Sequence, residues 1–430
     1  MKKLLSVLLA SATAVTACAG LAACEDPDPR TELVIWCPSA AIACYTALGE
    51  EFVTTYKDGL YKDYKVTCIA HEEGNAETDL GTDLTTGGDV YFTEGGQIAR
   101  LVDKGYILPL ADDYASYGTT VKKDNIEDSL PTATVGDKLY AFPATADNTW
   151  FFWYDKNFYS EDDIKTFDGV FKKAKEENMN IMFPYNNGWY VTAWFMTAGL
   201  KMDYVDDNGT KKYQFDVAGD NAKALAAAES LHKYVSTQEE GLMKNGKDPV
   251  IIGGDNATIP NGAKAGTLVA GFMGSWISSE VPSNIVPAAK APTINIGGEE
   301  KEMVNFFTYK YCAVNPGRKN VDVAVELAAF ITGEKGQAAR AKATGSAPTN
   351  IKASNSEEVK NSPIALALSD RRDHNYLQES HTSGFWSSWE SFGNDLRKKE
   401  GATTKEGLKA ALDTLHTNVL KGETEYKPAA

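Results

Sequence analysis

Short apolar strands alternate with amphipathic helices along the first part of the chain. Residues 32–36 have the pattern of a buried strand, and a helix is predicted from Pro38 onward because apolar side chains recur there at helical spacing. Further strands are predicted at 64–70 and 89–93, followed by a helix at 96–104. Parallel strands need a crossover connection, usually a helix. The alternation therefore predicts an α/β fold with a parallel, doubly wound sheet.

An aromatic run interrupts this alternation. From Leu139 to Tyr154 the chain is apolar and aromatic over a length too great for one strand, so we expect it to pass between two lobes. The total length of 430 residues also favours two lobes, because a single core rarely grows past about 250 residues. Other helices are predicted at 167–177, 190–198, 220–235, 321–332, 334–344 and 404–420, and other strands at 266–274 and 306–315.

Composition excludes several classes of protein. With 43% apolar and 24% charged residues, the chain is neither low-complexity, collagen-like nor a multi-span membrane protein. Its net charge of −16 argues against nucleic acid or an anionic membrane surface as the main partner, since both bind through an excess of Lys and Arg.

The N-terminus has the features of an export signal. Lys2 and Lys3 precede an uncharged run over residues 4–23, and Leu21-Ala22-Ala23-Cys24 resembles the lipobox of bacterial lipoproteins. We therefore predict cleavage after residue 23, lipidation of Cys24, and a polar tether over 24–30. A transmembrane anchor is the alternative, but small residues dilute the second half of the run. Loss of the two lysines moves the net charge from −16 to −18.

Four cysteines remain after the predicted processing, namely Cys37, Cys44, Cys68 and Cys312. Cys37 and Cys44 are close enough in sequence to form a disulfide outside the cytoplasm. The favoured alternative is that the four are small buried apolar side chains. The five histidines are scattered and no C-x-x-C occurs, so we predict neither a metal site nor a cofactor.

Several segments together resemble a known family. They are DVYFTEGGQIARLVDKGYILPL (89–110), GDKLYAFPATADNTWFFWYDKNFY (136–159), GTLVAGFMGSWISSEV (266–281) and AVELAAFITGEKGQAARAKATGSAPTN (324–350). With the lipobox, their order and spacing are similar to the family 1 extracellular solute-binding proteins of ABC importers. Within that family the resemblance is strongest to maltose- and maltodextrin-binding proteins.

The resemblance implies a two-lobe, periplasmic-binding-protein-like (type II) fold. Each lobe would be discontinuous in sequence, with a hinge between the lobes and the ligand cleft between them. The implied ranges are 31–143 plus 307–346 for the N-lobe, 148–303 plus 350–430 for the C-lobe, and 144–147, 304–306 and 347–349 for the hinge crossings.

The resemblance also implies three aromatic platforms for a sugar, at Trp189, Trp276 and Trp386. A sugar offers C–H faces to flat rings and hydroxyls to polar groups, so these residue types suit it. The alternative for each is an ordinary core tryptophan, and the resemblance outweighs it most for Trp276 and Trp386. The remaining tryptophans of this region, Trp150, Trp153, Trp194 and Trp389, are assigned to packing or a cleft edge.

Polar candidates lie beside these platforms. Glu94 follows the third predicted strand, at the edge where open parallel sheets bind ligands, and Asp147 and Asn148 lie at the first crossing. Asn186 and Asn187 precede Trp189. The chain departs from the family because Asn187 stands at an acidic position, which leaves the sugar linkage open. Solvated surface positions are the alternative for Glu94 and Asn186.

These observations predict a receptor that performs no chemistry. It would be a lipid-anchored monomer on the outer face of the cytoplasmic membrane that delivers an oligosaccharide, preferably maltodextrin-like, to an ABC permease. A polyamine is the main alternative ligand, because acids and tryptophans also form cation sites. A secreted glycoside hydrolase is disfavoured, since no recognisable catalytic segment occurs.

Overall fold

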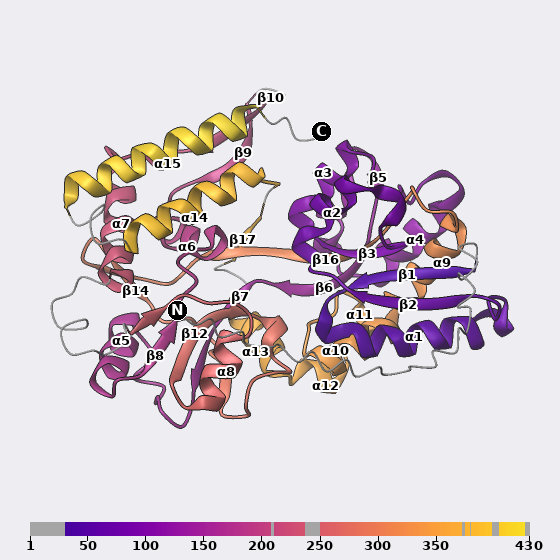
Figure 1. Ribbon diagram of the computed structural model, residues 1–430, viewed down its shortest axis with the longest axis horizontal. Helices are drawn as coiled ribbons and strands as arrows, with labels where there is room; N and C mark the ends of the chain where they lie inside the picture. Colours follow the sequence, from indigo (N-terminus) through magenta and orange to yellow (C-terminus); the bar gives the residue numbers. More distant parts are fainter. Residues whose placement is uncertain are drawn as a thin grey trace, which may run out of the picture.

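A computed structural model describes residues 31–207, 210–236, 250–371, 375–378, 380–397 and 404–425. The predicted signal, tether and lipidated Cys24 lie outside the described residues. The described chain forms two lobes, each with its own sheet, helices and buried core (Figure 1). We name them the N-lobe, which contains β1 (Glu32–Cys37), and the C-lobe, which contains β7 (Trp150–Asp155).

The N-lobe contains a six-stranded sheet with a parallel half. β1 pairs in parallel with β2 (Lys65–Ala70) on one side and with β3 (Val90–Glu94) on the other. β16 (Asn305–Val314) pairs antiparallel with β3. The strand order is β17-β16-β3-β1-β2, where β17 is Asn375–Leu377, and β6 (Phe142–Asn148) pairs with β16 beside this path. The predicted parallel arrangement is confirmed for β1, β2 and β3, whereas β16 runs antiparallel to β3 and β6 and parallel to β17.

Helices cover this sheet, and α1 shows how an apolar face is buried against it. In α1 (Ile42–Thr54) the buried residues Tyr45, Leu48 and Phe52 recur at helical spacing, as the sequence predicts. The other N-lobe helices are α2 (Ala76–Thr82), α3 (Ile98–Asp103), α4 (Ala115–Asp124), α9 (Val321–Ile331) and α10 (Glu334–Thr344), and a small hairpin joins β4 (Thr134–Val135) to β5 (Lys138–Leu139).

The C-lobe contains a five-stranded sheet in the order β11-β8-β12-β7-β13. Its other strands are β8 (Asn180–Met182), β11 (Ile251–Ile252), β12 (Leu268–Gly274) and β13 (Ile285–Pro287), and two hairpins are formed by β9 (Met202–Asp207) with β10 (Thr210–Phe215) and β14 (Ile294–Ile296) with β15 (Glu299–Lys301). The helices are α5 (Phe167–Glu176), α6 (Gly188–Thr197), α7 (Ala222–Val235), α8 (Thr258–Ala265), α13 (Pro363–Arg371), α14 (Ser383–Arg397) and α15 (Lys405–Glu425).

Within the described residues, three segments run between the lobes. β6 and β16 extend across the middle of the molecule as an antiparallel pair (Figure 1). The third segment lies beside them, because Ala146 N donates to Ala347 O over 2.7 Å. It continues through the short helices α11 (Ile351–Ser354) and α12 (Glu357–Lys360). The aromatic run does pass between the lobes, as two strands, β6 and then β7; the residue boundaries of the predicted hinge stay a prediction.

The C-lobe core is rich in aromatic side chains. Trp150, Trp153, Trp194 and Trp389 are each at most 1% exposed, which confirms their assignment to packing. Phe272 of β12 lies 5.1 Å from Trp150 and 6.4 Å from Trp194 between ring centroids. Because this core is close-packed, it restrains the side chains that project from the same lobe toward the N-lobe.

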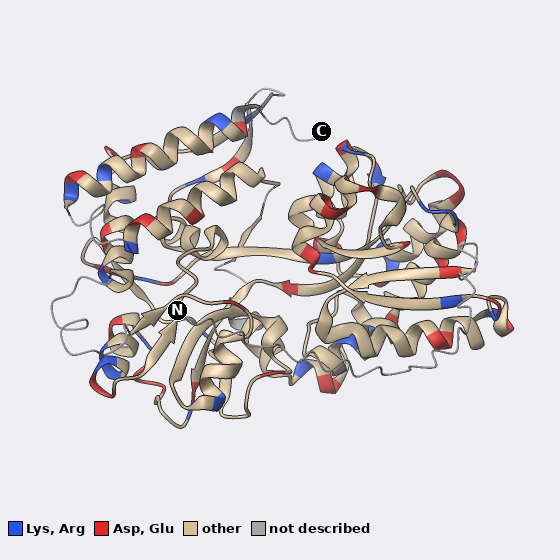
Figure 2. Cartoon of the chain, viewed as in Figure 1, with Lys and Arg blue, Asp and Glu red and all other residues tan. Residues whose placement is uncertain are grey.

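Charged residues lie mainly on the outer helices and loops of both lobes, with acidic and basic ones interspersed (Figure 2). No helix among the described residues is long and apolar enough to span a membrane.

Candidate ligand-binding site

A cavity of about 1140 Å³ lies between the two lobes. Its N-lobe wall comes from α2, α3 and the end of β3, and its C-lobe wall comes from the loop before α6, the loop before α8, the end of β12 and the start of α14. Six predicted site residues line it: Glu94, Asn148, Asn187, Trp189, Trp276 and Trp386. Asn186 is exposed and is not among the lining residues, and Asp147 lines a separate small cavity.

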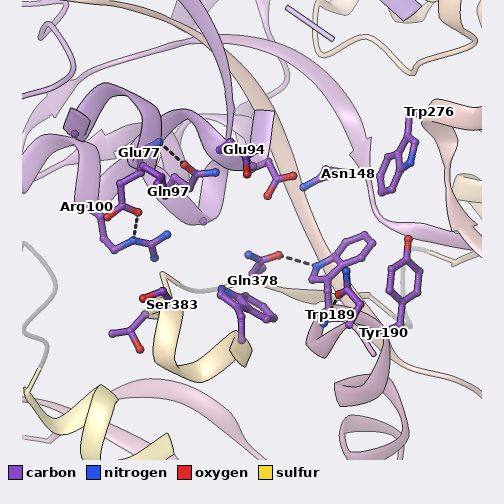
Figure 3. A pocket seen from close by; sticks show the side chains of 18 of the residues that line it. Glu77, Glu94, Gln97, Arg100, Asn148, Trp189, Tyr190, Trp276, Gln378 and Ser383 are labelled. Atoms are coloured by element: carbon purple, nitrogen blue, oxygen red, sulfur yellow. Dashed lines mark hydrogen bonds and ion pairs between the residues drawn. The ribbon is translucent and has the colours of Figure 1, made fainter. Parts of the chain in front are cut away.

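Trp189 and Trp276 form an aromatic pair on the C-lobe wall (Figure 3). Their ring centroids are 6.0 Å apart and their planes differ by 35°. Trp189 lies in the first turn of α6, where Asn187 caps the helix by accepting the Trp189 N–H over 3.0 Å. Trp276 follows β12 in a short 3₁₀ turn and packs over Gly274, where a Cβ would lie 2.0 Å from the indole.

Both indole N–H groups are already satisfied by side-chain amides. Trp189 Nε1 donates to Gln378 Oε1 over 2.9 Å (Figure 3), and Trp276 Nε1 donates to Asn256 Oδ1 over 2.7 Å. Neither amide is predicted from the sequence. Gln378 follows a short strand and Asn256 lies in the loop before α8. Neither has a local sequence pattern that would distinguish it from a surface residue.

Trp386 extends the aromatic wall from the first turn of α14. It is half-buried, with its ring edge-on to Phe385 at 4.7 Å and to Phe306 at 5.8 Å between centroids. The three tryptophans implied by the resemblance therefore lie on one wall of one cavity, although their role in binding stays a prediction.

The opposite wall is polar and charged. Figure 3 shows Glu77, Gln97 and Arg100 facing the aromatic wall, with Glu94 and Asn148 between the two sides. The Glu77 carboxylate is 2.6 Å from both Arg100 Nε and Lys104 Nζ. Burial raises the pKa of Glu77, but these two cations outweigh it and hold that pKa below its usual value.

Glu94 differs from Glu77 because it has no ion pair within the part of the chain that the structure describes. It ends β3 and is half-buried at the cavity wall. Burial raises the pKa of Glu94 above its usual value, and the charge of Glu73 adds to this, against the opposing effect of Lys310. Its carboxylate is therefore an acceptor that a ligand with hydroxyl donors would stabilise.

Arg100 connects the two walls directly. From α3 of the N-lobe its Nη1 donates to Ser380 Oγ over 3.1 Å and to the backbone oxygen of His381, both in the C-lobe. Burial, with the charge of Arg100, lowers the pKa of His381 to about 3, so the imidazole is neutral at ordinary pH. The acceptors of Arg100 on the C-lobe, a hydroxyl and a backbone oxygen, are both uncharged, and the neutral imidazole adds no repulsion.

A cluster of four charged residues lies behind the cavity, around a second cavity of about 30 Å³. Lys310 Nζ donates a hydrogen bond to the Glu73 carboxylate, and Arg340 Nη2 lies 2.9 Å from the other oxygen of that carboxylate. Burial raises the pKa of Glu73, but the two cations hold it below its usual value. Asp147 Oδ2 has no hydrogen-bond partner among the described residues. Trp276 lines both cavities, and Lys310 Nζ lies 4.9 Å from its ring centroid.

Within the described ranges, no three or more His, Cys, Asp or Glu side chains are grouped so that they could hold a metal ion. The thiols of Cys37, Cys44, Cys68 and Cys312 are free; Cys37 and Cys312 are buried, and the other two are partly exposed.

Comparison with known proteins identifies the family. Residues 51–367 match the family described as bacterial extracellular solute-binding protein. The chain belongs to this family. It is 24% identical to the galactooligosaccharide-binding protein of Bacillus subtilis (strain 168) over 324 residues, which is 72% of each protein.

Solved structures give the same result for the fold. A structure with acarbose matches with a TM-score of 0.76 and 27% identity, covering 92% of this chain and 99% of the other. The maltodextrin-binding protein of L. casei BL23, solved without ligand, matches with a TM-score of 0.66 and 22% identity, covering 90% and 98%. The predicted solute-binding family and two-lobe α/β fold are confirmed.

Proposed function

We propose that this protein captures a neutral oligosaccharide, preferably maltodextrin-like, in the cavity between its lobes and delivers it to an ABC permease without chemical change. The pair formed by Trp189 and Trp276 carries the proposal, because the two ring centroids lie 6.0 Å apart and both rings line a large cavity that also has polar groups. Sugar rings stack their C–H faces on such rings while their hydroxyls bond to carboxylates and amides. Glu94 and Asn148 line the same cavity and offer such groups.

The similar proteins support the choice of ligand class. One is named for galactooligosaccharides, one was solved with acarbose and one is named for maltodextrin. All of these ligands are oligosaccharides or their analogues, and the named proteins are binding proteins rather than enzymes. The tilt of 35° between the two indoles suits a chain of sugar units that curves along the wall.

A polyamine is less well matched to the same cavity. Acids and tryptophans can bind a cation, but Glu77 is already paired with Arg100 and Lys104. A thermal-shift series with maltotriose, a galactooligosaccharide and spermidine tests the choice, because ligands of the native state raise its melting temperature. We expect a rise with a sugar; a rise with spermidine alone would overturn the proposal.

Hydrolysis is a separate test of the receptor function. A glycosidase would need two carboxyl groups about 5–10 Å apart across the scissile bond. Incubation with maltoheptaose, followed by chromatography of the sugars, is expected to return the heptasaccharide intact. The appearance of shorter sugars would contradict a role in binding alone.

Anchoring at Cys24 on the outer face of the cytoplasmic membrane is part of the same proposal and is supported by Leu21-Ala22-Ala23-Cys24. Mass spectrometry of the exported protein should find a diacylglycerol-modified Cys24 as the first residue, and an unmodified N-terminus would refute the anchor.

A further inference from the structure

The two cleft tryptophans differ from the core tryptophans in how their indole N–H groups are bonded. In the core, Trp153 Nε1 donates to the backbone oxygen of Met273 and Trp194 Nε1 to Ser230 Oγ. In the cleft, the acceptors are the side-chain amides of Gln378 and Asn256, which come from two separate loops. Both amides also line the cavity, so each is in contact with the space that a ligand would fill.

The chemistry of the indole fixes which way each amide faces. An indole N–H is a donor only, so the amide oxygen must face it and the NH₂ must point elsewhere. The bond also leaves the N–H unavailable to the ligand and restrains rotation of the ring about its side-chain torsions. The planes of the two rings differ by 35°, and each ring has one such hydrogen bond beside its packing contacts.

Gln378 links its tryptophan to the middle of the molecule. It follows β17 (Asn375–Leu377), which pairs with the start of β16, and Gln378 N donates to Phe307 O over 2.8 Å. It is 8% exposed, whereas Asn256 is exposed on its loop. The Trp189 ring is thereby tied to the strand that crosses between the lobes, and the Trp276 ring is tied to a local turn.

We propose that Gln378 and Asn256 are positioning residues that hold the ring planes of Trp189 and Trp276 for the ligand. The proposal rests on the function proposed above and deepens it. It assigns these two amides an effect on sugar affinity through the tryptophans, with Gln378 the stronger of the two because it is buried and joined to β16.

Paired substitutions test the proposal. Gln378→Met removes the acceptor at similar volume, and Gln378→Glu keeps an acceptor; Asn256→Leu and Asn256→Asp form a second pair. Calorimetry with maltotriose should show about fivefold weaker binding for Gln378→Met, the scale of one lost hydrogen bond, and near wild-type binding for Gln378→Glu. Near-ultraviolet circular dichroism without ligand should change for Gln378→Met and not for Gln378→Glu. Gln214→Met, at an exposed glutamine outside the cavity, is the matched control.

Each other result contradicts the proposal. Unchanged affinity and dichroism for Gln378→Met would show that packing alone holds Trp189. A Gln378→Glu variant as weak as Gln378→Met would assign the loss to an amide NH₂ that contacts the ligand. If Gln378→Met fails to fold, the exposed Asn256 pair decides by the same criteria. If the wild type does not bind maltotriose, the proposed function fails, while the dichroism of the free protein still tests the positioning.

Discussion

The two walls of the cavity contribute differently to ligand recognition. The C-lobe wall is aromatic, with Trp189 and Trp276 set on a large apolar core, whereas the N-lobe wall carries Glu77, Arg100 and Glu94. Flat rings on a packed core are preorganised and lose little entropy on binding. Charged side chains must first lose water, and most of those on the N-lobe wall are already paired with each other. We therefore expect the affinity for the ligand to come from the C-lobe wall, and the N-lobe wall to orient the ligand and to hold the two lobes closed.

Loss of a ring from the aromatic wall should have the largest effect on binding. Trp276→Ala removes a face that lines the cavity and rests on Lys310, and we expect sugar binding to weaken by about 2 kcal/mol or more, the scale of a buried aromatic anchor. Calorimetry with maltotriose measures it. Trp36→Ala is the control, since Trp36 stacks on His71 outside the cavity. Equal affinity of Trp276→Ala and wild type would place the main affinity on the N-lobe wall.

The same contrast separates what the sequence predicts from what it leaves out. β1 and α1 match their predicted ranges within two residues or begin with a short turn, because each is set by a local apolar pattern, and α10 matches because Gly345 ends it in the left-handed conformation. Trp189, Trp276 and Trp386 could be predicted as cavity residues because, once the resemblance is known, few other roles fit a tryptophan near the edge of a lobe. Their acceptors Gln378 and Asn256 could not, since polar loop residues have no period.

Asp147 shows a limit of a different kind. The sequence places it beside Asn148 at the crossing, and both are buried, but alternation along β6 sends only Asn148 to the large cavity. Side-chain direction in a strand follows from register, and the register here includes shifts between β16 and β6. The polar half of the site was therefore harder to predict than the aromatic half.

Arg100 is the residue through which the N-lobe wall should act on closure. Arg100→Met removes its bonds to Ser380 and His381 and should weaken sugar binding by about 1–2 kcal/mol, mostly through faster dissociation. Stopped-flow fluorescence measures that rate. Arg100→Lys, which lacks the planar fork, should give an intermediate rate. Lys165→Met breaks an exposed ion pair away from the cavity and serves as control. A slower association with unchanged dissociation would show that Arg100 does not hold the lobes together.

Substitution of Glu94 should have the smallest effect, but the direction of its effect on stability is fixed by the pKa shift. Because burial raises its pKa in the folded state, ionisation opposes folding; the cost is absent below the usual value of 4.5, grows as pH rises from there to the raised pKa, and is constant above it. Glu94→Gln should therefore be more stable than wild type at pH 7, by about 1 kcal/mol or less, and equal to it in acid. Its sugar affinity should be lower at pH 7 and lose the pH dependence of the wild type, whose binding weakens as Glu94 is protonated. Thermal unfolding and calorimetry from pH 4 to 8 measure both. If the variant were less stable than wild type at neutral pH, Glu94 would already be stabilised as an anion in the free protein. The N-lobe wall would then recognise the charge of a ligand more than the hydroxyls of a sugar.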